Sequence, residues 1–314
     1  MMPVHMSGYS IGLDLGGTNL RAAVIDSEGK MLEKTAGATN FAEGREAVLS
    51  DIVDGIQHLR ERHGAAGLAG IGIGVPGFIR MKEGFITNSN NLPYFENFPI
   101  RDAIEQRLGT RVILENDANA AALGEKWIGA GRGVDDLVMV TLGTGIGGGI
   151  ISGGRVLRGF VGMAGELGHT TVVPDGNPCG CGNRGCLEKH ASATAVAAMA
   201  RMMHLGEHLT AKDVYDLARQ EGEVGEKARA IWQVMGESLG VALATLVNTF
   251  NFPLYVLSGG VLPAWEFFAP SMMETVRRRS YTFRATETKI TQATLGNEAG
   301  LYGAANLPWS EPLG

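Results

Sequence analysis

The sequence predicts an α/β protein built from a duplicated unit. Extended apolar segments alternate with segments of helical periodicity along the chain, a pattern typical of sheets covered by helices. A glycine motif after the first predicted strand, Leu15-Gly16-Gly17-Thr18, recurs in the second half as Leu142-Gly143-Thr144-Gly145. Each motif stands between two extended runs with no helix between them, so a β-hairpin is expected at both places.

The first repeat reads as a hairpin followed by alternating helices and strands. Residues 9–15 and 20–25 are extended runs around the glycine motif, and a turn at residues 27–30 leads into a third strand. Residues 43–63 carry apolar side chains at helical spacing. The further elements expected are a strand at 68–75, a helix at 100–108, a strand at 112–114 and an alanine-rich helix at 120–127.

The second repeat is expected to follow the same plan with more helix. The elements expected are strands at 136–142, from 150, at 254–257 and at 290–293, with helices at 192–203, 211–220, 223–248, 266–279 and 298–306. The limit between the repeats is predicted near residue 120. This gives a smaller domain of residues 1–120, joined by the C-terminal segment 298–314, and a larger domain of residues 121–297.

Size, charge and cysteine content restrict the classes of function. The 314 residues are 45% hydrophobic and carry a net charge of −6, which disfavours a nucleic-acid or membrane surface as partner. No run of about 18 apolar residues predicts a transmembrane helix, and the N-terminus does not resemble a signal peptide. The three cysteines are clustered, as expected of free thiols in a reducing compartment. A cytoplasmic protein is predicted.

A metal site is the most specific prediction. Cys179, Cys181 and Cys186 stand among glycines that let the backbone turn tightly, and His169 precedes them. Three thiolates and one imidazole complete a tetrahedral zinc shell with no position left for water, which indicates a structural ion. A disulfide is disfavoured, because the cysteine count is odd and Cys179 and Cys181 are too close for a relaxed bridge. On spacing alone, His190 remains an alternative fourth ligand.

The glycine-rich loops predict phosphate binding by hairpin tips. Residues 72–77 and 143–148 match the spacing of the dinucleotide fingerprint, but the first contains a proline, the second leads into a strand, and no P-loop motif occurs. The two hairpin tips and a third glycine pair, Gly259-Gly260, could present amides and hydroxyls to a nucleotide. Asp14, beside the first tip, is a candidate ligand for Mg²⁺, directly or through water. An ordinary hairpin turn is the alternative for either loop alone.

Polar side chains in short insertions between apolar segments predict a site for a hydroxyl-rich ligand. A sugar needs paired donors and acceptors around its ring, and carboxylates and amides supply them. The candidates are Asn90, Asn91, Asn116, Asp117, Glu166, His169 and Glu188. Asp117 could also cap the helix that is expected to begin nearby.

These motifs resemble the ROK family of sugar kinases and sugar-responsive repressors, and within it the bacterial glucokinases. The resemblance covers nearly the whole chain, and the cysteine-rich segment is its most specific part. The motifs that carry it are the segments 14–19, 115–117, 142–147, 165–169 and 179–188. His190 departs from the family pattern, which often has tyrosine at this place.

The resemblance implies a duplicated ribonuclease-H-like fold of the actin and hexokinase type, with a cleft between two domains. It implies that Asp117 is the catalytic base and that His169 completes the zinc site with Cys179, Cys181 and Cys186. The sugar is expected at Asn91, Asn116, Asp117, Glu166, His169 and Glu188. ATP and Mg²⁺ are expected at Asp14, Gly16, Gly17, Thr18, Asn19, Gly143, Thr144, Gly145, Gly259 and Gly260.

The activity implied is the ATP-dependent phosphorylation of glucose at its 6-hydroxyl, a step of glycolysis, by a homodimer. A kinase for mannose, fructose, allose or N-acetylmannosamine is the first alternative, because one altered contact can change the preferred sugar. A sugar-sensing repressor is less favoured, since Asp14 lies near the start of the sequence, where a repressor carries its DNA-binding region. Polyphosphate as the donor is also less favoured, because no basic track is evident.

Overall fold

The structure is a computed structural model, and it describes residues 8–16, 19–81, 83–88 and 92–310. The chain divides into two compact units. Unit 1 comprises Met1–Asp135, Gly149–Ala164 and Thr294–Gly314, and unit 2 comprises Asp136–Gly148 and Gly165–Ala293. This division differs from the expected limit near residue 120, which would fall inside a helix that packs within unit 1.

Unit 1 is built on a five-stranded sheet with the order β3-β2-β1-β4-β7. Its strands are β1 (Tyr9–Leu15), β2 (Asn19–Asp26), β3 (Met31–Ala38), β4 (Leu68–Val75) and β7 (Ile113–Asn116). Strands β1, β2 and β3 are antiparallel neighbours, whereas β4 and β7 continue the sheet in parallel with β1. The register pairs Asp14 with Arg21 and Leu15 with Leu20, so the predicted first hairpin is confirmed.

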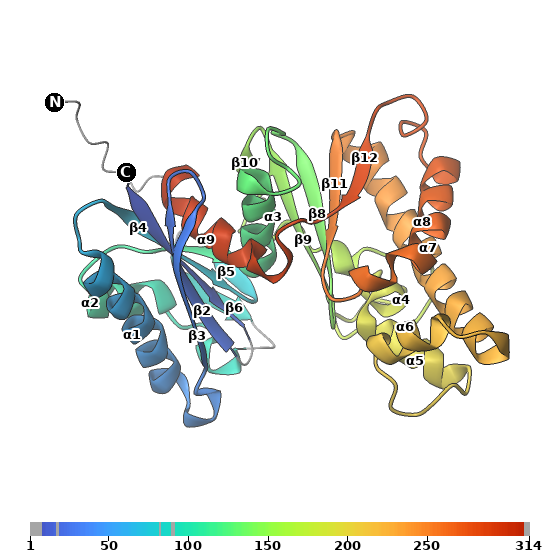
Figure 1. The fold of residues 1–314 in the computed structure, drawn as a ribbon, viewed down its shortest axis with the longest axis horizontal. Helices are drawn as coiled ribbons and strands as arrows, with labels where there is room; N and C mark the ends of the chain where they lie inside the picture. Colours follow the sequence, from blue (N-terminus) through green and yellow to red (C-terminus); the bar gives the residue numbers. More distant parts are fainter. Residues whose placement is uncertain (1–7, 17–18, 82, 89–91, 311–314) are drawn as a thin grey trace. The chain divides into compact units, whose positions relative to one another are not determined.

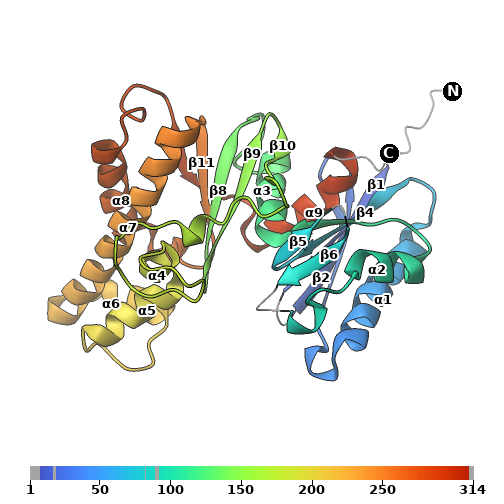
Figure 2. The ribbon, with the colours of Figure 1, turned by 180° about the vertical axis from the view of Figure 1, so that it is seen from behind.

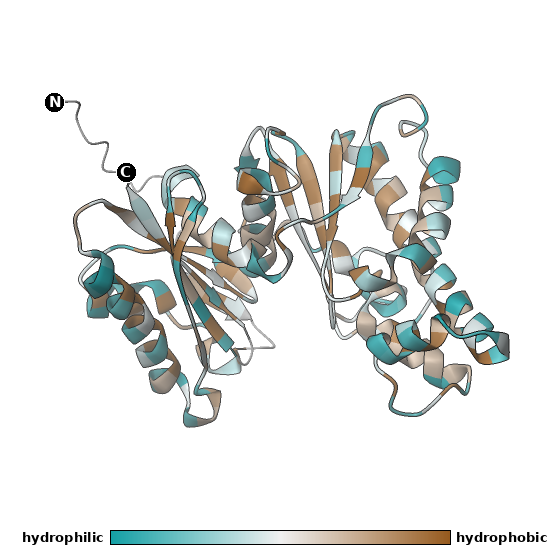
Figure 3. Ribbon diagram, in the orientation of Figure 1, coloured by the Kyte–Doolittle hydropathy of each residue, from teal (hydrophilic) through white to brown (hydrophobic). Residues whose placement is uncertain are grey.

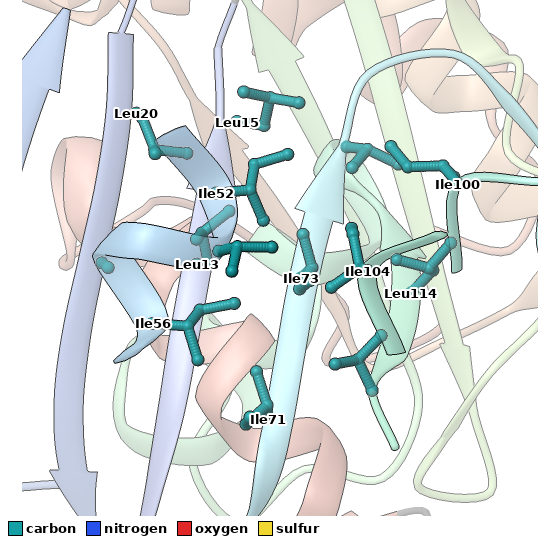
Figure 4. Packing of buried hydrophobic residues seen from close by; sticks show 14 of the residues in the cluster. Leu13, Leu15, Leu20, Ile52, Ile56, Ile71, Ile73, Ile100, Ile104 and Leu114 are labelled. Carbon is teal, nitrogen blue, oxygen red and sulfur yellow. The ribbon is translucent and has the colours of Figure 1, made fainter. Parts of the chain in front are cut away.

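Helices cover both faces of this sheet (Figure 1). On one face lie α1 (Arg45–His63) and α2 (Ile100–Leu108), and on the other lies α9 (Ala299–Ser310), with α3 (Asp117–Ile128) packed against it. Every residue of β1 is buried, as expected of a strand covered on both sides. Figure 4 shows Leu13, Ile52 and Ile73 meeting in the core between the sheet and the first pair of helices.

Helices α3 and α9 approach each other closely through glycines. A Cβ at Gly303 would lie 1.6 Å from the carbonyl oxygen of Ala120, and one at Gly124 would lie 2.2 Å from that of Ala299. Side chains at these two positions would therefore separate the helices. The C-terminal helix is fixed in unit 1 by this crossing.

A buried carboxylate holds the chain where it returns to unit 1. Glu125 of α3 is fully buried and accepts hydrogen bonds from the amides of Ala130, Thr294 and Leu295 at 2.7, 3.0 and 2.8 Å. Gly129 lies so close that a Cβ there would be 2.1 Å from Glu125 Oε2. One side chain therefore ties the end of α3 to the start of the segment that contains α9.

The second sheet repeats the order of the first, as β10-β9-β8-β11-β12, so the predicted duplication is confirmed. Its strands are β8 (Leu137–Leu142), β9 (Ile146–Ser152), β10 (Arg155–Val156), β11 (Leu254–Ser258) and β12 (Lys289–Gln292). As with β4 and β7 in the first sheet, β11 and β12 run parallel to the central strand, here β8. Strand β9 begins at Ile146 rather than at Ile150, because the glycines after Ile146 pair within the strand.

The helices of unit 2 are α4 (Glu188–Ala191), α5 (Ala193–Met202), α6 (Ala211–Ala218), α7 (Gly222–Phe250) and α8 (Trp265–Arg279). Figures 1 and 2 show α7 and α8 beside one another along one side of β8, β11 and β12. Among the described helices, α7 is the one long and apolar enough to cross a membrane by length and composition. However, 61% of its most apolar window is buried inside the protein, as expected of a core helix.

Hydropathy follows this layering, and the elements that the sequence did not predict are short. In Figure 3 the apolar residues lie along the strands, whereas polar residues gather on the outer faces of α1 and α8. The unpredicted strands are the hairpin β5 (Phe78–Arg80) and β6 (Phe85–Asn88), together with β10. The short 3₁₀ helices are η1 (Phe41–Glu43), η2 (Pro93–Phe95), η3 (Leu167–His169), η4 (Leu262–Ala264) and η5 (Gly296–Glu298).

Candidate functional site

The tip of the first hairpin carries a buried acid. Asp14 is 8% exposed near the end of β1 and forms an ion pair with Arg21, which also donates to the carbonyl oxygen of Asn297 at 2.7 Å. Burial raises the pKa of Asp14, and the Arg21 guanidinium opposes this shift. The Gly16 amide donates to the Asn19 carbonyl at 2.8 Å and closes the tip. Two predicted nucleotide ligands, Gly17 and Thr18, lie outside the described residues.

The tip of the second hairpin, residues 143–145, is held by hydrogen bonds from the first residues of α5. The Gly143 amide donates to the Gly145 carbonyl at 3.0 Å, and the Gly143 carbonyl accepts from the Ala193 amide at 2.9 Å. The Thr194 hydroxyl donates to the Thr144 carbonyl at 2.7 Å. The carbonyl groups of the tip therefore have partners inside unit 2, and its backbone conformation is set before any ligand arrives.

The third glycine pair lies against the second tip. Gly259 follows β11 with a φ of +106°, and a Cβ there would be 2.2 Å from the carbonyl oxygen of Leu142, the last residue of β8. A Cβ at Gly260 would meet nothing within 4 Å, so its backbone is accessible. Unit 2 thus brings together two of the three glycine segments that the sequence predicts to bind a nucleotide.

Asp117 is displayed at a strand-to-helix turn of unit 1. Asn116 is the N-cap of α3, and its Oδ1 accepts from the amides of Ala118 and Asn119 at 2.9 and 3.2 Å. The alternative that Asp117 is the cap is therefore wrong: Asp117 is the first helical residue, and its side chain is exposed. A carboxylate at this place is favoured by the partial positive charge of the helix N-terminus.

Three predicted sugar ligands gather in unit 2. Glu166 precedes η3 and His169 is its last residue, with Glu166 Oε2 3.9 Å from His169 Nε2. Glu188 begins α4, and its Oε2 accepts from the Ile146 amide at 3.1 Å. Burial raises the pKa of Glu166, His169 opposes the shift, and the nearby Glu188 carboxylate adds to it. Two carboxylates and an imidazole therefore lie within electrostatic reach of one another.

Glu188 also contacts the second glycine tip. A Cβ at Gly145 would lie 2.5 Å from Glu188 Oε2, so glycine is required there while this carboxylate keeps its place. The sequence assigned Gly145 to the nucleotide and Glu188 to the sugar. Their contact joins the two predicted binding regions within unit 2.

The predicted zinc ligands converge. One ligand atom from each of His169, Cys179, Cys181 and Cys186 lies within 4.8 Å of the others. Cys179 Sγ is 3.7 Å from His169 Nδ1, and Cys181 Sγ is 3.7 Å from Cys186 Sγ. Sulfurs about 2.3 Å from a tetrahedral zinc ion are about 3.8 Å apart, so these donors fit zinc.

The spacing of the sulfurs also has an electrostatic consequence. Burial and the two neighbouring sulfurs raise the pKa of Cys186 to about 11. Three thiolates would repel one another at this spacing without a cation between them. His169 points Nδ1 at the sulfurs and Nε2 at Glu166, so one imidazole can serve the metal and a ligand together.

His190, the alternative ligand, is not part of the cluster. Its Nε2 is buried without a hydrogen-bond partner in the described structure, and a Cβ at Gly176 would lie 2.8 Å from it. Burial lowers the pKa of His190, which favours the neutral ring. Two further candidates, Asn90 and Asn91, lie outside the described residues.

Sequence reasoning missed one charged pair beside Asp117. Glu115 is 1% exposed and forms an ion pair with Arg158 at 2.6 Å. The only signal for Glu115 was its place in the segment 115–117, and Arg158 lies too far along the chain to suggest its partner.

Comparison with known proteins gives a consistent result. The profile described as the ROK family matches residues 10–310. A glucokinase of Halalkalibacterium halodurans is 37% identical over 94% of this chain and 93% of its own length. The ROK hexokinase from Thermus thermophilus has a TM-score of 0.85 at 38% identity, covering 95% of this chain and 96% of that one. A ROK family glucokinase from Streptomyces griseus in complex with glucose and AMPPNP has a TM-score of 0.77 at 35% identity, covering 96% and 99%.

Proposed function

The chain belongs to the ROK family, and we propose that it is an ATP-dependent glucokinase, a hexokinase-type phosphotransferase that acts on the 6-hydroxyl of glucose. The observation that carries this proposal is the full-length similarity to a ROK glucokinase whose structure holds glucose and AMPPNP. The geometry within each unit is consistent with it, since unit 1 displays an exposed carboxylate and unit 2 gathers polar side chains beside a glycine tip.

Asp117 is proposed as the general base. Carboxylates in general are weak bases toward an alcohol, with a pKa of about 4 in model peptides. This is sufficient, because phosphoryl transfer passes through a loose transition state in which positioning and charge stabilisation do most of the work. The side chain would orient the 6-hydroxyl and accept its proton as the new P–O bond forms.

The sugar is proposed to bind Asn91, Asn116, Asp117, Glu166, His169 and Glu188. Asn116 can donate only one hydrogen bond to the sugar. Its oxygen caps α3, and its Nδ2 donates to the Gly77 carbonyl at 3.2 Å, which leaves one N–H of the amide for a ligand. Glu166 and Glu188 are acceptors for ring hydroxyls, and His169 Nε2 adds a donor when Nδ1 binds the metal.

The nucleotide is proposed to lie against the glycine segments, with Asp14, Gly16, Gly17, Thr18, Asn19, Gly143, Thr144, Gly145, Gly259 and Gly260 around it. A bound Mg²⁺ would neutralise charge on the phosphates, and it is commonly held by one or two carboxylates together with those phosphates. Asp14 suits this role through water, because its carboxylate is ion-paired with Arg21 and largely buried.

Zinc is proposed as a structural ion held by His169, Cys179, Cys181 and Cys186. It would supply architecture rather than reaction chemistry, since four protein ligands leave no open position. It would hold the segment that bears Glu188 and orient His169 toward the sugar. The proposal also includes a cytoplasmic homodimer that acts in glycolysis and binds no nucleic acid.

A coupled ADP-release assay tests the activity. The zinc-loaded protein would be given MgATP with glucose, mannose, fructose, allose or N-acetylmannosamine. With polyphosphate in place of ATP no ADP is formed, so there the sugar phosphate itself would be measured. We expect glucose to have the highest kcat/KM with ATP. Preference for another sugar would overturn the choice of glucose but keep a sugar kinase, whereas no turnover by folded protein with either donor would overturn the kinase.

Asp117→Asn tests the base. We expect kcat to fall about 10²–10⁴-fold, while glucose binding measured by calorimetry stays close to wild type. Asp135→Asn, an exposed carboxylate of unit 1 that pairs with Lys126, is the matched control and should leave kcat unchanged. A kcat near wild type in Asp117→Asn would remove Asp117 from this role.

A further inference from the structure

The carboxylate of Glu115 is enclosed by N–H donors. Its Oε1 accepts from the Asn116 amide at 2.9 Å and from Asn119 Nδ2 at 3.0 Å. Its Oε2 accepts from Arg158 Nε at 2.8 Å and lies 2.6 Å from Arg158 Nη2. A buried group with four N–H donors is a strong structural constraint, because moving it would leave several buried donors without an acceptor.

These partners require the ionised form of Glu115. Burial raises the pKa of this carboxyl, and the Arg158 guanidinium is the largest influence in the opposite direction. A protonated carboxyl would direct its O–H at one of the four N–H groups, since all four partners are donors. The pair is therefore a buried carboxylate held by a guanidinium, a geometry that stabilises both charges.

The bonds of Glu115 fall on both sides of Asp117. The Asn116 amide precedes Asp117, and Asn119 follows it within the first turn of α3. Gly74 of β4 lies beneath this turn, where a Cβ would be 3.9 Å from the Asp117 Cα and 3.5 Å from the Ala120 Cβ. The backbone around Asp117 therefore packs against Gly74 of β4. The Glu115 carboxylate binds the residue before Asp117 and a residue one turn after it.

Arg158 connects this turn to a compact loop, residues 158–164. The Ala164 amide donates to the Arg158 carbonyl at 3.0 Å and closes the loop, and Gly162 packs so tightly that a Cβ would lie 2.5 Å from the Ile79 carbonyl oxygen. Arg158 also lines a cavity of about 490 Å³ next to the fully exposed Phe160. In sequence, the loop leads directly to Gly165 and Glu166.

We propose that Glu115, through its pair with Arg158, is a positioning residue that holds Asp117 in the orientation needed for phosphoryl transfer. Glu115 is buried, so it acts through the turn and does not contact the sugar. The proposal rests on the function proposed above and deepens it, since it assigns to Glu115 and Arg158 the support of the Asp117 carboxylate.

Glu115→Gln is the direct test. It keeps the size of the side chain and one acceptor oxygen, but it removes the charge and turns an amide donor toward Arg158. We expect kcat to fall about 10–100-fold, with KM for glucose and for ATP changed less than about threefold. Glu46→Gln, which removes an exposed partner of Arg107 in unit 1, is the matched control and should leave kcat unchanged.

Double variants separate positioning from loss of folding. In Asp117→Asn the base is already absent, so adding Glu115→Gln should lower kcat by less than about threefold further. Arg158→Lys, which keeps the charge, should retain more activity than Arg158→Met. Thermal melting and zinc content would be measured for each variant, and the rate comparison made at a temperature where all are folded.

The outcomes are distinct. Additive losses in Asp117→Asn/Glu115→Gln, or a parallel fall of kcat and melting temperature with Arg158→Lys no better than Arg158→Met, would overturn the positioning role. A wild-type level of kcat in Glu115→Gln would overturn it as well. No turnover by the wild-type protein with any sugar would overturn the proposed function first, and this inference with it.

Discussion

The two glycine hairpins occupy equivalent places in the two sheets, yet they are held in different ways. At the first tip, Asp14 pairs with Arg21 across the strands. At the second, the matching position is Thr141, whose Oγ1 accepts from the Gly147 amide at 3.2 Å. The second tip also rests on Glu188 through Gly145. The duplication has kept the course of the backbone, while the side chains around it have diverged.

This difference suggests that the two tips have different functions. The first tip offers a carboxylate, which suits a cation near phosphates. The second tip offers backbone only, but it contacts Glu188, which stands among the proposed sugar ligands and follows the cysteines of the proposed zinc site. The insertion that carries these residues, between β10 and α5, has a counterpart in unit 1 of only a short connection between β3 and α1. Repetition of a fold therefore does not imply repetition of a site.

Of the substitutions that distinguish the two hairpins, neutralising Asp14 should lower kcat the most. Asp14→Asn keeps the size of the side chain but removes the charge proposed to hold Mg²⁺, and kcat is expected to fall about 100-fold or more. The measurement is kcat with ATP over a range of Mg²⁺ concentrations, where excess Mg²⁺ should restore part of the rate.

The control for Asp14 is the matching position in the second hairpin. Thr141→Val removes one neutral hydrogen bond, which is worth about 1 kcal/mol, so kcat should change less than about fivefold. Equal losses in the two variants would show that the acid of the first tip has no special role.

Loss of the metal should affect the proposed sugar ligands beside the second hairpin and spare the first hairpin. Cys181→Ala leaves three ligands, so we expect less bound zinc, a melting temperature lower by several degrees, and a KM for glucose raised about 10–100-fold. KM for ATP should change less than about threefold. Metal analysis, thermal melting and steady-state kinetics provide these values.

The control lies in the same loop. Gly180→Ala should leave zinc content and KM unchanged, because a Cβ there meets nothing within 4 Å. If Cys181→Ala kept both zinc and glucose affinity, the structural role of the cluster would be wrong.

Most of the fold could be predicted because its signals are local. Alternating apolar runs and helical periodicity are each visible within one segment, and the glycine motif repeats plainly. Together they predicted both hairpins and the helices from α1 to α9 except the four-residue α4. The short hairpin β5–β6 was missed because its strands are too brief for a periodic pattern. The division at Asp135 differs from the predicted limit near residue 120, because it depends on the contact between α3 and α9, which are distant in sequence.

The site was less predictable where it depends on contacts between segments. The convergence of the three cysteines could be predicted, because three cysteines in one loop are rare and chemically specific. The cap of α3 was uncertain, since Asn116 and Asp117 are both good caps and only the backbone conformation decides between them. The pairs Glu115 with Arg158 and Gly145 with Glu188 join residues far apart in the chain, and no local pattern indicates them.

Adding a side chain at Gly145 should raise KM for glucose less than loss of the metal does. The added Cβ of Gly145→Ala would lie 2.5 Å from Glu188 Oε2 and must displace that carboxylate from the Ile146 amide. We expect KM for glucose to rise about tenfold, as for one lost hydrogen bond to a charged group. At the first tip, Gly16→Ala meets only the Asn19 carbonyl at 3.3 Å and should change KM for glucose less.

A third glycine completes this test. Gly37→Ala on β3, where a Cβ meets nothing within 4 Å, controls for the substitution itself. If Gly145→Ala and Gly16→Ala raised KM for glucose equally, the contact with Glu188 would not distinguish the two tips.

The smallest expected effect concerns His190, which belongs to the insertion found only beside the second hairpin. Burial lowers its pKa in the folded protein below the unfolded value of about 6.5, so the unfolded chain binds the proton more readily. Stability is therefore fully present above about pH 6.5 and falls as the pH drops toward the folded-state pKa. His190→Phe keeps an aromatic ring and removes the buried nitrogen, so its urea midpoint should fall less than that of wild type between about pH 7.5 and pH 5.5. The other titrating groups are common to both proteins, which leaves His190 as the source of any difference in this fall. Identical pH dependence in the two proteins would mean that the His190 ring gains a proton as easily in the folded insertion as in the unfolded chain.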